Sequence, residues 1–345
     1  MVTCLKTKKE NTQEGLRFLR DNQWLDHEFQ MGKSGKYVLL AITSEADQSA
    51  ILAHISGTIE QRNLRKVEKE ARTMKAALSK IIPEEQLDQI NRGYEAIGDI
   101  AVIEIPDELT KLEINIAWTL KRIHPNIKVV AKKDKKTSGT YRIRKVKVLV
   151  GEKRTETLHK ESGAQIKVDL NKVYFSPKMG SERLRILKQI KSDEKILVGF
   201  AGTGAYGLIF AKKFPNIRVW MIELNPSAIR LMKENIKINK LTKRVKAIKG
   251  DFTEEFTQLN EKFDRIIMVF PSNPWPYVDA VLKNAQINTT VHFYTFGNEH
   301  EIKIAFDHLN KLAHKNKQKI KILNHVKAGN FSPKVYRWCI EFKVL

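Results

Sequence analysis

A strand-like run, Ile196-Leu197-Val198-Gly199-Phe200, leads directly into the glycine turn Ala201-Gly202-Thr203-Gly204-Ala205 and then into a helical pattern. Glycines suit this turn because a ligand approaches the backbone closely at the carboxyl edge of a sheet, where β-carbons would obstruct it. A strand, a glycine turn and a helix in succession are typical of a parallel α/β sheet. The turn alone is a weak functional signal, because many such turns are purely structural.

The same alternation of strand and helix continues on both sides of this turn. Apolar runs typical of strands lie at residues 195–200, 218–223, 245–249, 265–270 and 292–296. Helical patterns lie at residues 181–191, 206–214, 228–239 and 277–284. This order predicts βαβ units and a doubly wound α/β sheet from residue 166 onward.

Acidic residues end or follow the next two predicted strands. The carboxylate of Glu223, about 20 residues beyond the glycines, suits both hydroxyls of a ribose. Asp251 is placed to accept a hydrogen bond from an adenine amino group, with the ring of Phe252 beside the base. Together with the glycine turn, these positions predict a nucleoside cofactor.

The glycines alone leave two cofactor classes open. Gly202, Gly204 and Gly207 satisfy the G-x-G-x-x-G spacing of dinucleotide sites. We favour S-adenosylmethionine, because the third strand end offers an adenine site and the sequence pattern shows no second dinucleotide-binding half.

The chain is strongly basic. Its 345 residues contain 62 Lys and Arg against 39 Asp and Glu, a net charge of +23. Such an excess favours a polyanionic partner, with nucleic acid ahead of an acidic membrane surface or a simple bias toward solvated lysines. Residues 121–160 hold 14 of these cations against 3 acids, and residues 142–148 alternate cationic and apolar side chains. That alternation predicts a strand with either a phosphate-contacting or a merely solvated basic face.

The length suits two or three domains. A helical pattern lies between residues 59 and 82. Residues 60–75 within it are almost all polar or charged, and we interpret them as a connecting helix or a linker. We therefore expect domains at residues 1–75, 76–165 and 166–345.

Two cysteines exclude a disulfide scaffold or a multi-thiolate metal site, and no apolar run predicts a secretion signal or membrane span. These features predict a cytoplasmic protein without a metal centre.

Several motifs resemble one family closely. They are the runs from Val168 to Lys178, Glu182-Arg183-Leu184-Arg185 and Glu223-Leu224-Asn225-Pro226. Together with the glycine turn, they resemble the archaeal and eukaryotic tRNA (guanine-37-N1)-methyltransferases. Further matches cover most of the chain: Cys4-Leu5-Lys6, Trp24-Leu25-Asp26, Ile97-Gly98-Asp99-Ile100-Ala101, His124-Pro125-Asn126, Tyr141-Arg142-Ile143-Arg144 and Gly151-Glu152.

The resemblance to the archaeal three-domain branch implies an architecture and an activity. A Rossmann-like class I methyltransferase domain would follow a small α+β domain that binds the tRNA elbow and a basic α+β middle domain. The enzyme would transfer a methyl group from S-adenosylmethionine to N1 of guanine 37, beside the tRNA anticodon. We expect a monomer, because the sequence gives no sign of an obligate protein partner. Some members of this branch also, or instead, methylate C7 of a wyosine precursor at the same nucleotide.

The resemblance also implies roles for individual residues. Methylation at N1 requires removal of the N1 proton while negative charge spreads toward O6. Glu182 resembles the base and Arg142 the cation that stabilises O6, although Glu182 also suits a helix start and Arg142 lies in a generally basic stretch. The cofactor-binding candidates are Tyr174, Phe200, Gly202, Gly204, Glu223, Asn225, Asp251 and Phe252. The tRNA-binding candidates are Arg144, Lys178, Arg183, Arg185 and Asn273.

The sequence departs from the family pattern at two positions. Val198 and Val269 stand where the family has Asp and Asn, and valine cannot form side-chain hydrogen bonds. A nearby run, Asn273-Pro274-Trp275-Pro276-Tyr277, resembles the Asn-Pro-Pro-Tyr loop of amino-methyltransferases. Either it restores a polar group that the two valines lack, or it is a proline-rich turn without a catalytic role. A tRNA-binding protein with a degenerate pocket therefore stays a second hypothesis.

Overall fold

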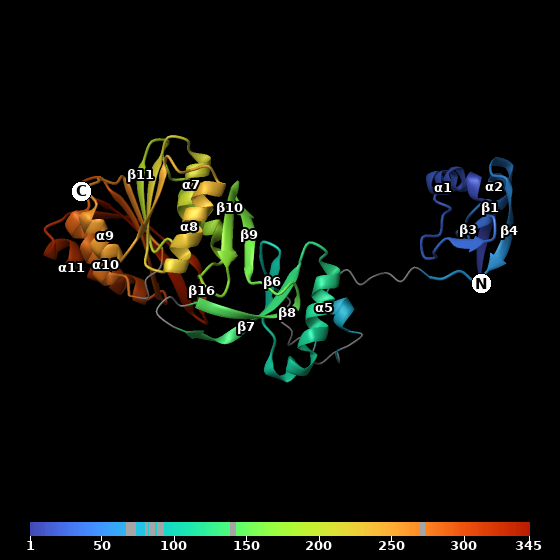
Figure 1. The fold of residues 1–345 in the computed structure, drawn as a ribbon, viewed down its shortest axis with the longest axis horizontal. Helices are drawn as coiled ribbons and strands as arrows, with labels where there is room; N and C mark the ends of the chain where they lie inside the picture. Colours follow the sequence, from blue (N-terminus) through green and yellow to red (C-terminus); the bar gives the residue numbers. More distant parts are fainter. Residues whose placement is uncertain (67–73, 80–81, 83–86, 88–92, 139–142, 270–272) are drawn as a thin grey trace. The chain divides into compact units, whose positions relative to one another are not determined.

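The computed structural model describes residues 1–66, 74–79, 82, 87, 93–138, 143–269 and 273–345, with backbone only at 74–75, 135–138 and 144. The chain divides into two compact units, Met1–Arg72 and Thr73–Leu345 (Figure 1). Within the described ranges, no helix is both long enough and apolar enough to cross a membrane.

The first unit is a small α+β domain. Its antiparallel sheet has the order β2-β3-β1-β4, formed by β1 (Val2–Lys8), β2 (Gly32–Ser34), β3 (Tyr37–Ala41) and β4 (Gly57–Arg62). Helices α1 (Thr12–Asp21) and α2 (Gln48–His54) cover a core that includes Leu5, Leu19 and Leu40. The helical texture predicted from residue 59 is wrong for β4. Its pairing with β1, more than fifty residues earlier in the chain, stabilises a strand that the local pattern does not predict.

The second unit begins with a region built on the sheet β5-β6-β7-β8. Its elements are α3 (Met74–Leu78), β5 (Glu95–Ile97), β6 (Ile100–Ile103), η2 (Asp107–Leu112), α5 (Glu113–Ile123), β7 (Val129–Ser138) and β8 (Ile143–Gly151), followed by the hairpin β9 (Glu156–Glu161) and β10 (Ala164–Asp169). Lys145 and Lys147 are exposed around buried Val146, so the predicted alternation is confirmed for that part of β8.

A seven-stranded sheet forms the rest of the unit, in the order β13-β12-β11-β14-β15-β17-β16. Its strands are β11 (Lys195–Gly199), β12 (Arg218–Glu223), β13 (Val245–Lys249), β14 (Arg265–Met268), β15 (Thr290–Gly297), β16 (Ile320–Ser332) and β17 (Val335–Val344). Strands β11 to β15 are parallel, and β17 runs antiparallel to its neighbours β15 and β16. The predicted Rossmann-like fold class is therefore confirmed.

Helices cover both faces of this sheet (Figure 1). One core lies under α6 (Gly180–Leu187), α7 (Ala205–Lys213) and α8 (Pro226–Ile238), and the other under α9 (Phe252–Gln258), α10 (Trp275–Asn284) and α11 (Glu301–Lys315). Because β11 lies between β12 and β14, the order of strands reverses beside it. In open α/β sheets, the carboxyl ends of the strands at such a reversal form the ligand-binding crevice.

Candidate active site

The glycine turn after β11 has the backbone conformation that its sequence predicts. Gly202 and Gly204 have φ angles of +58° and +91°, in the left-handed region that favours glycine. A Cβ at Gly202 would approach only the carbonyl oxygen of Tyr174, at 3.7 Å, so this part of the turn is open to a ligand. Phe200 also has a positive φ, +56°, and such a conformation in a bulky residue is typical of functional sites.

Glu223, at the end of β12, binds the backbone on two sides. One carboxylate oxygen accepts a hydrogen bond from the N–H of Gly202 and the other from the N–H of Asn225, each at 2.8 Å. Asn225 caps α8 through its side-chain oxygen and donates from Nδ2 to the carbonyl oxygen of Lys172 at 2.9 Å. Glu223 therefore holds the glycine turn, and Asn225 holds the segment that leads to Tyr174, at one edge of the sheet.

The third strand end has an acidic cap and an aromatic group. Asp251 uses Oδ1 to cap α9, accepting from the N–H of Thr253 at 2.8 Å. Phe252 is only 2% exposed, and a Cβ at Gly199 would lie 2.5 Å from its ring, so Phe252 packs beneath β11. The half-buried ring of Phe200 stacks on Phe252, with centroids 5.3 Å apart.

These residues fit the predicted cofactor. The open, positive-φ turn offers close approach to the backbone, and Glu223 offers a carboxylate beside it. Asp251 follows β13 and Phe200 follows β11, the two strands that flank β12 and its Glu223. They are the groups that would hold the adenosine part of S-adenosylmethionine. When bound, that molecule supplies a methyl group activated on a positively charged sulfur.

Glu182, the proposed base, is buried in the first turn of α6. Its carboxylate accepts two hydrogen bonds from Arg185, at 2.7 and 2.8 Å, and one from the hydroxyl of Tyr294 at 2.7 Å. Burial alone would raise the pKa of Glu182, but the bonds from Arg185 and Tyr294 outweigh it and lower that pKa. The carboxylate is therefore ionised at neutral pH, as an acceptor of a proton must be.

Two tyrosines connect Glu182 with the helix that follows the glycine turn. The hydroxyl of Tyr294 lies 3.3 Å from the hydroxyl of Tyr206, which is in the first turn of α7. Both tyrosines are buried. This arrangement brings the carboxylate of Glu182 toward the start of α7, where Gly204 is the N-cap residue.

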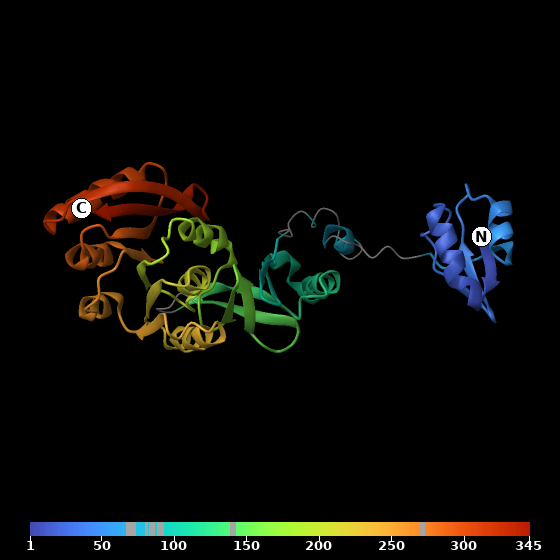
Figure 2. The same cartoon turned by 90° about the horizontal axis from the view of Figure 1, so that it is seen from above.

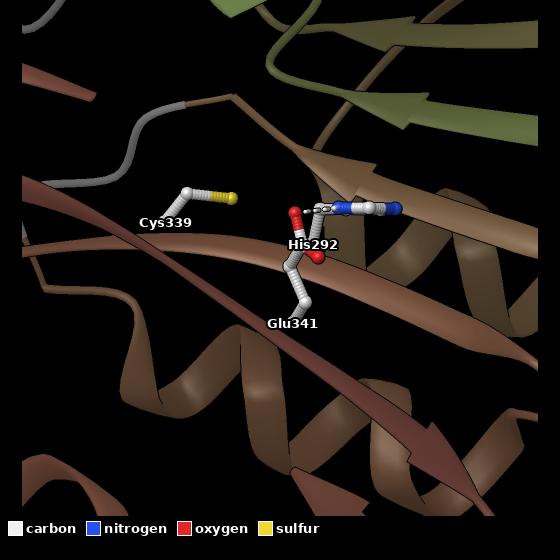
Figure 3. A group of neighbouring side chains, drawn as sticks. All are labelled: His292, Cys339 and Glu341. Atoms are coloured by element: carbon white, nitrogen blue, oxygen red, sulfur yellow. Dashed lines mark ion pairs between the residues drawn. The ribbon is translucent and has the colours of Figure 1, made fainter. Parts of the chain in front are cut away.

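A polar network continues from Glu182 into the sheet. Arg185 also pairs with Glu341 of β17, and the Nδ1 atom of His292 lies 3.4 Å from a Glu341 oxygen. His292 and Glu341 form a close group with Cys339 (Figure 3). On the other side, Nε2 of His292 accepts from Arg265, which pairs in turn with Glu194.

This buried group has donors of the type that bind metals, but its charges favour an ion-pair network. Burial would raise the pKa of Glu341, yet His292 and Arg185 outweigh it and hold that pKa at about 2. Burial raises the pKa of the Cys339 thiol well above its usual value, so the thiol is neutral and a poor metal ligand. Guanidinium groups contact both Glu341 and His292, and positive charge there opposes a cation. We assign the group to positioning Arg185.

The predicted tRNA-binding residues have different surroundings. Arg183 is 3% exposed and makes bonds of 2.7 and 2.6 Å to the two carboxylate oxygens of Glu161. Arg185 belongs to the network around Glu182. Lys178 is largely exposed, 3.0 Å from Glu95. Asn273 is exposed two residues before α10 and accepts a long bond of 3.4 Å from the N–H of Trp275.

Two predicted residues depend on parts of the chain with little or no description. Arg142 lies outside the described residues, and Arg144 is described only as backbone of β8. The positions that depart from the family pattern are both described. Val198 is fully buried in the core, and Val269 is half-buried just after β14, with its N–H bonded to the carbonyl of Gly199.

Sequence reasoning missed Tyr294, His292 and Glu341. A usable signal exists, because His292 and Glu341 are polar residues within otherwise apolar strand runs, and buried polar groups need partners. Those partners lie more than 25 residues away, in other elements. The network therefore becomes visible only in the folded chain.

The Glu161–Arg183 pair predicts a loss of stability in acid. Burial would raise the pKa of Glu161, but bonds from His159 and Arg183 outweigh it and hold that pKa at about 2, against 4.5 for an ordinary glutamate. Since the folded pKa is depressed, this stabilisation is complete above about pH 4.5 and is lost as the pH falls toward 2. The difference corresponds to about 3 kcal/mol.

Denaturant unfolding of the wild type and of Glu161→Gln between pH 6 and pH 2.5 measures this effect. The difference in unfolding free energy between the wild type and Glu161→Gln should shrink steadily below pH 4.5. For the control Glu108→Gln, at an exposed site, the difference from the wild type should stay the same at every pH. A difference that does not change with pH would contradict the pKa assignment.

Comparison with known proteins agrees with this geometry. Residues 157–323 match the model of the TRM5/TYW2 methyltransferase domain, and residues 74–155 match that of the TYW2 N-terminal domain. The tRNA (guanine(37)-N(1))-methyltransferase Trm5b of Methanocaldococcus jannaschii is 30% identical over 352 residues, covering 100% of this chain and 99% of that protein. The Trm5b of Pyrococcus abyssi is 34% identical over 264 residues, covering 76% of this chain and 78% of its own.

A solved structure of aTrm5 in complex with tRNALeu is similar over the whole chain. It superposes with a TM-score of 0.75 at 28% identity and covers 99% of both chains. The methyltransferase-domain match, residues 157–323, includes the glycine turn, Glu182 and Glu223 described above. The chain therefore belongs to the TRM5/TYW2 methyltransferase family.

Proposed function

We propose that this protein is an S-adenosylmethionine-dependent methyltransferase that modifies N1 of guanine 37 in tRNA. The observation that carries the proposal is the ionised, buried carboxylate of Glu182, linked through Tyr294 and Tyr206 to the helix after the glycine turn. The family and the two relatives named for this reaction support the same activity.

In the proposed reaction, the chain positions guanine and manages one proton. Glu182 accepts the N1 proton, and Arg185 and Tyr294 hold its carboxylate in place. Arg142 offsets the charge that develops on O6, a role that rests on the family resemblance. Tyr174 lies beside the glycine turn, where it would flank the cofactor or the target base. The guanine must be splayed out of the anticodon loop to reach this site.

The proposed tRNA contacts extend over three domains, at residues 1–75, 76–165 and 166–345. Exposed Lys145 and Lys147 on β8, together with Arg144, would contact the tRNA backbone. Lys178 and Asn273 lie exposed in the catalytic domain, while Arg183 and Arg185 would support the site from within. The first domain would bind the tRNA elbow. A monomer is sufficient for this arrangement, and two free thiols suit a reducing cytoplasm.

A methylation assay tests the proposal. The full-length protein is incubated with labelled S-adenosylmethionine and tRNA transcripts that carry G or A at position 37, and the modified nucleoside is identified. We expect 1-methylguanosine with G37 and no product with A37. Equal labelling of both transcripts would refute the proposed target.

Two further arms separate the alternative activities. A tRNA that carries the wyosine precursor at position 37 tests C7 methylation. Tight, salt-sensitive tRNA binding without methyl transfer to any substrate would instead support a binding protein with a degenerate pocket, as Val198 and Val269 suggest.

A further inference from the structure

The hairpin of β16 and β17 places its tip at the active edge of the sheet. Strand β17 is antiparallel to β15, with Tyr336 opposite Gly297 at the carboxyl end of β15. The tip, residues 327–337, therefore lies at the edge that also holds Glu223 and the glycine turn. Figure 2 shows the two strands in dark red. Residues 324–345 lie beyond the part of the chain that matches the family model.

An irregular register exposes an aromatic side chain at this tip. Phe331 is the extra residue between the pairs Asn330–Tyr336 and Ser332–Val335, and it is 54% exposed. Bulges of this kind redirect a side chain and are frequent beside active sites. The ring of Phe331 lies 4.6 Å from that of Phe296, centroid to centroid. The strands are joined through Pro333 and Lys334, and Lys334 has a φ of +62°.

The tip that carries Phe331 is basic. Residues 327–337 contain three Lys and Arg and no Asp or Glu. Lys327 lies over the rings of Tyr336 and Trp338, at 4.2 and 5.4 Å from their centroids, and pairs with the exposed Glu299. Lys334 is exposed at the turn. Aromatic rings among cations are typical of surfaces that bind single-stranded nucleic acid.

The tip also contacts the segment that leads to the proposed base. Arg337 contacts the sulfur of Met179, in the short helix η3 (Pro177–Met179) directly before α6. Ala328 packs against the core cluster that contains Met179. Glu182 follows three residues after Met179, so an RNA segment on this tip would lie near the target guanine.

We propose that the hairpin tip binds a nucleotide that flanks the target guanine, with its base stacked on Phe331 and its phosphate near Lys327 and Lys334. This inference rests on the proposed function, which supplies a splayed anticodon loop as the single-stranded partner. Stacking on an aromatic ring tolerates any base, so the contact would help to hold the loop open in many tRNAs. The acid-free sequence around the tip favours RNA over an apolar protein segment.

The test uses the full-length protein with Phe331→Ala, Phe331→Trp and the matched control Leu323→Ala. Leu323 is 47% exposed at another bulge of the same strand, away from the tip. We expect Phe331→Ala to raise the KM for a G37 transcript about tenfold and to leave the Kd for S-adenosylmethionine unchanged. Phe331→Trp should restore the wild-type KM, and Leu323→Ala should change neither constant.

A second measurement reports stacking directly. In transcripts with 2-aminopurine beside position 37, on one side or the other, the wild type should quench the fluorescence more strongly than Phe331→Ala at saturating protein. A wild-type KM in Phe331→Ala with equal quenching, or an equal loss in Leu323→Ala, would overturn the proposal. Failure of the wild type to methylate G37 would instead refute the proposed function, while the fluorescence comparison still tests the RNA contact.

Discussion

Glu182→Gln is expected to lower kcat for methylation of G37 by about 10²- to 10³-fold, since general base catalysis contributes roughly this factor. Glutamine has nearly the same shape and retains a carbonyl oxygen for Arg185 or Tyr294, but it cannot accept the N1 proton. Single-turnover kinetics with saturating tRNA and cofactor measure this step. The Kd for S-adenosylmethionine should stay within about twofold, because Glu182 lies outside the groups proposed to hold the cofactor.

Asp193→Asn is the matched control, since it neutralises an exposed carboxylate just beyond the same helix. It should leave kcat unchanged. The lowered pKa of Glu182 also predicts that this carboxylate causes no change in the wild-type rate above about pH 4.5. An equal loss of cofactor binding and turnover in Glu182→Gln would show that Glu182 is structural and that another group takes the proton.

Glu223→Ala is expected to weaken S-adenosylmethionine binding by about 10²-fold. The substitution leaves the N–H groups of Gly202 and Asn225 without their acceptor and also removes the carboxylate proposed to bind the ribose. Bonds to a charged group contribute about 1.5–3 kcal/mol each, so the loss of one such bond to the cofactor and a loosened turn account for this factor. Titration calorimetry with S-adenosylmethionine measures it.

Glu254→Ala controls for the loss of negative charge near the same edge, because Glu254 is exposed in the first turn of α9. It should bind S-adenosylmethionine as the wild type does. The affinity of Glu223→Ala for tRNA should also be preserved. If Glu223→Ala binds the cofactor with wild-type affinity, the carboxylate serves only to hold the glycine turn, and the proposed contact with the ribose is refuted.

The local patterns around the cofactor edge were sufficient to predict much of its geometry. The glycine turn, Glu223 at the end of β12 and Asp251 before α9 lie where the alternation of strands and helices predicts them. These features depend on residues close together in the chain. Gly202 has a positive φ, and Asn225 and Asp251 each cap a helix by accepting from the N–H two residues later. Short-range geometry of this kind is readable from sequence.

Other features depended on pairs of residues far apart. Strand β4 pairs with β1, which is distant in the sequence. Arg183, which the family resemblance suggested for tRNA binding, is buried against Glu161 of β9. The hairpin of β16 and β17 was not predicted, although the acid-free composition of its tip, residues 327–337, is visible in the sequence.

By itself, the sequence determined the α/β class of the catalytic domain, the glycine turn, the carboxylates at the strand ends and the family. Each of these follows from backbone preferences within a few residues or from a motif in continuous sequence. Only the tertiary structure decided that Glu182 is held ionised by Arg185 and Tyr294, that Glu341 and His292 extend this network, and that Phe331 lies at the active edge. The physical reason is that burial and ion pairing depend on groups from distant strands, whose approach no local pattern records.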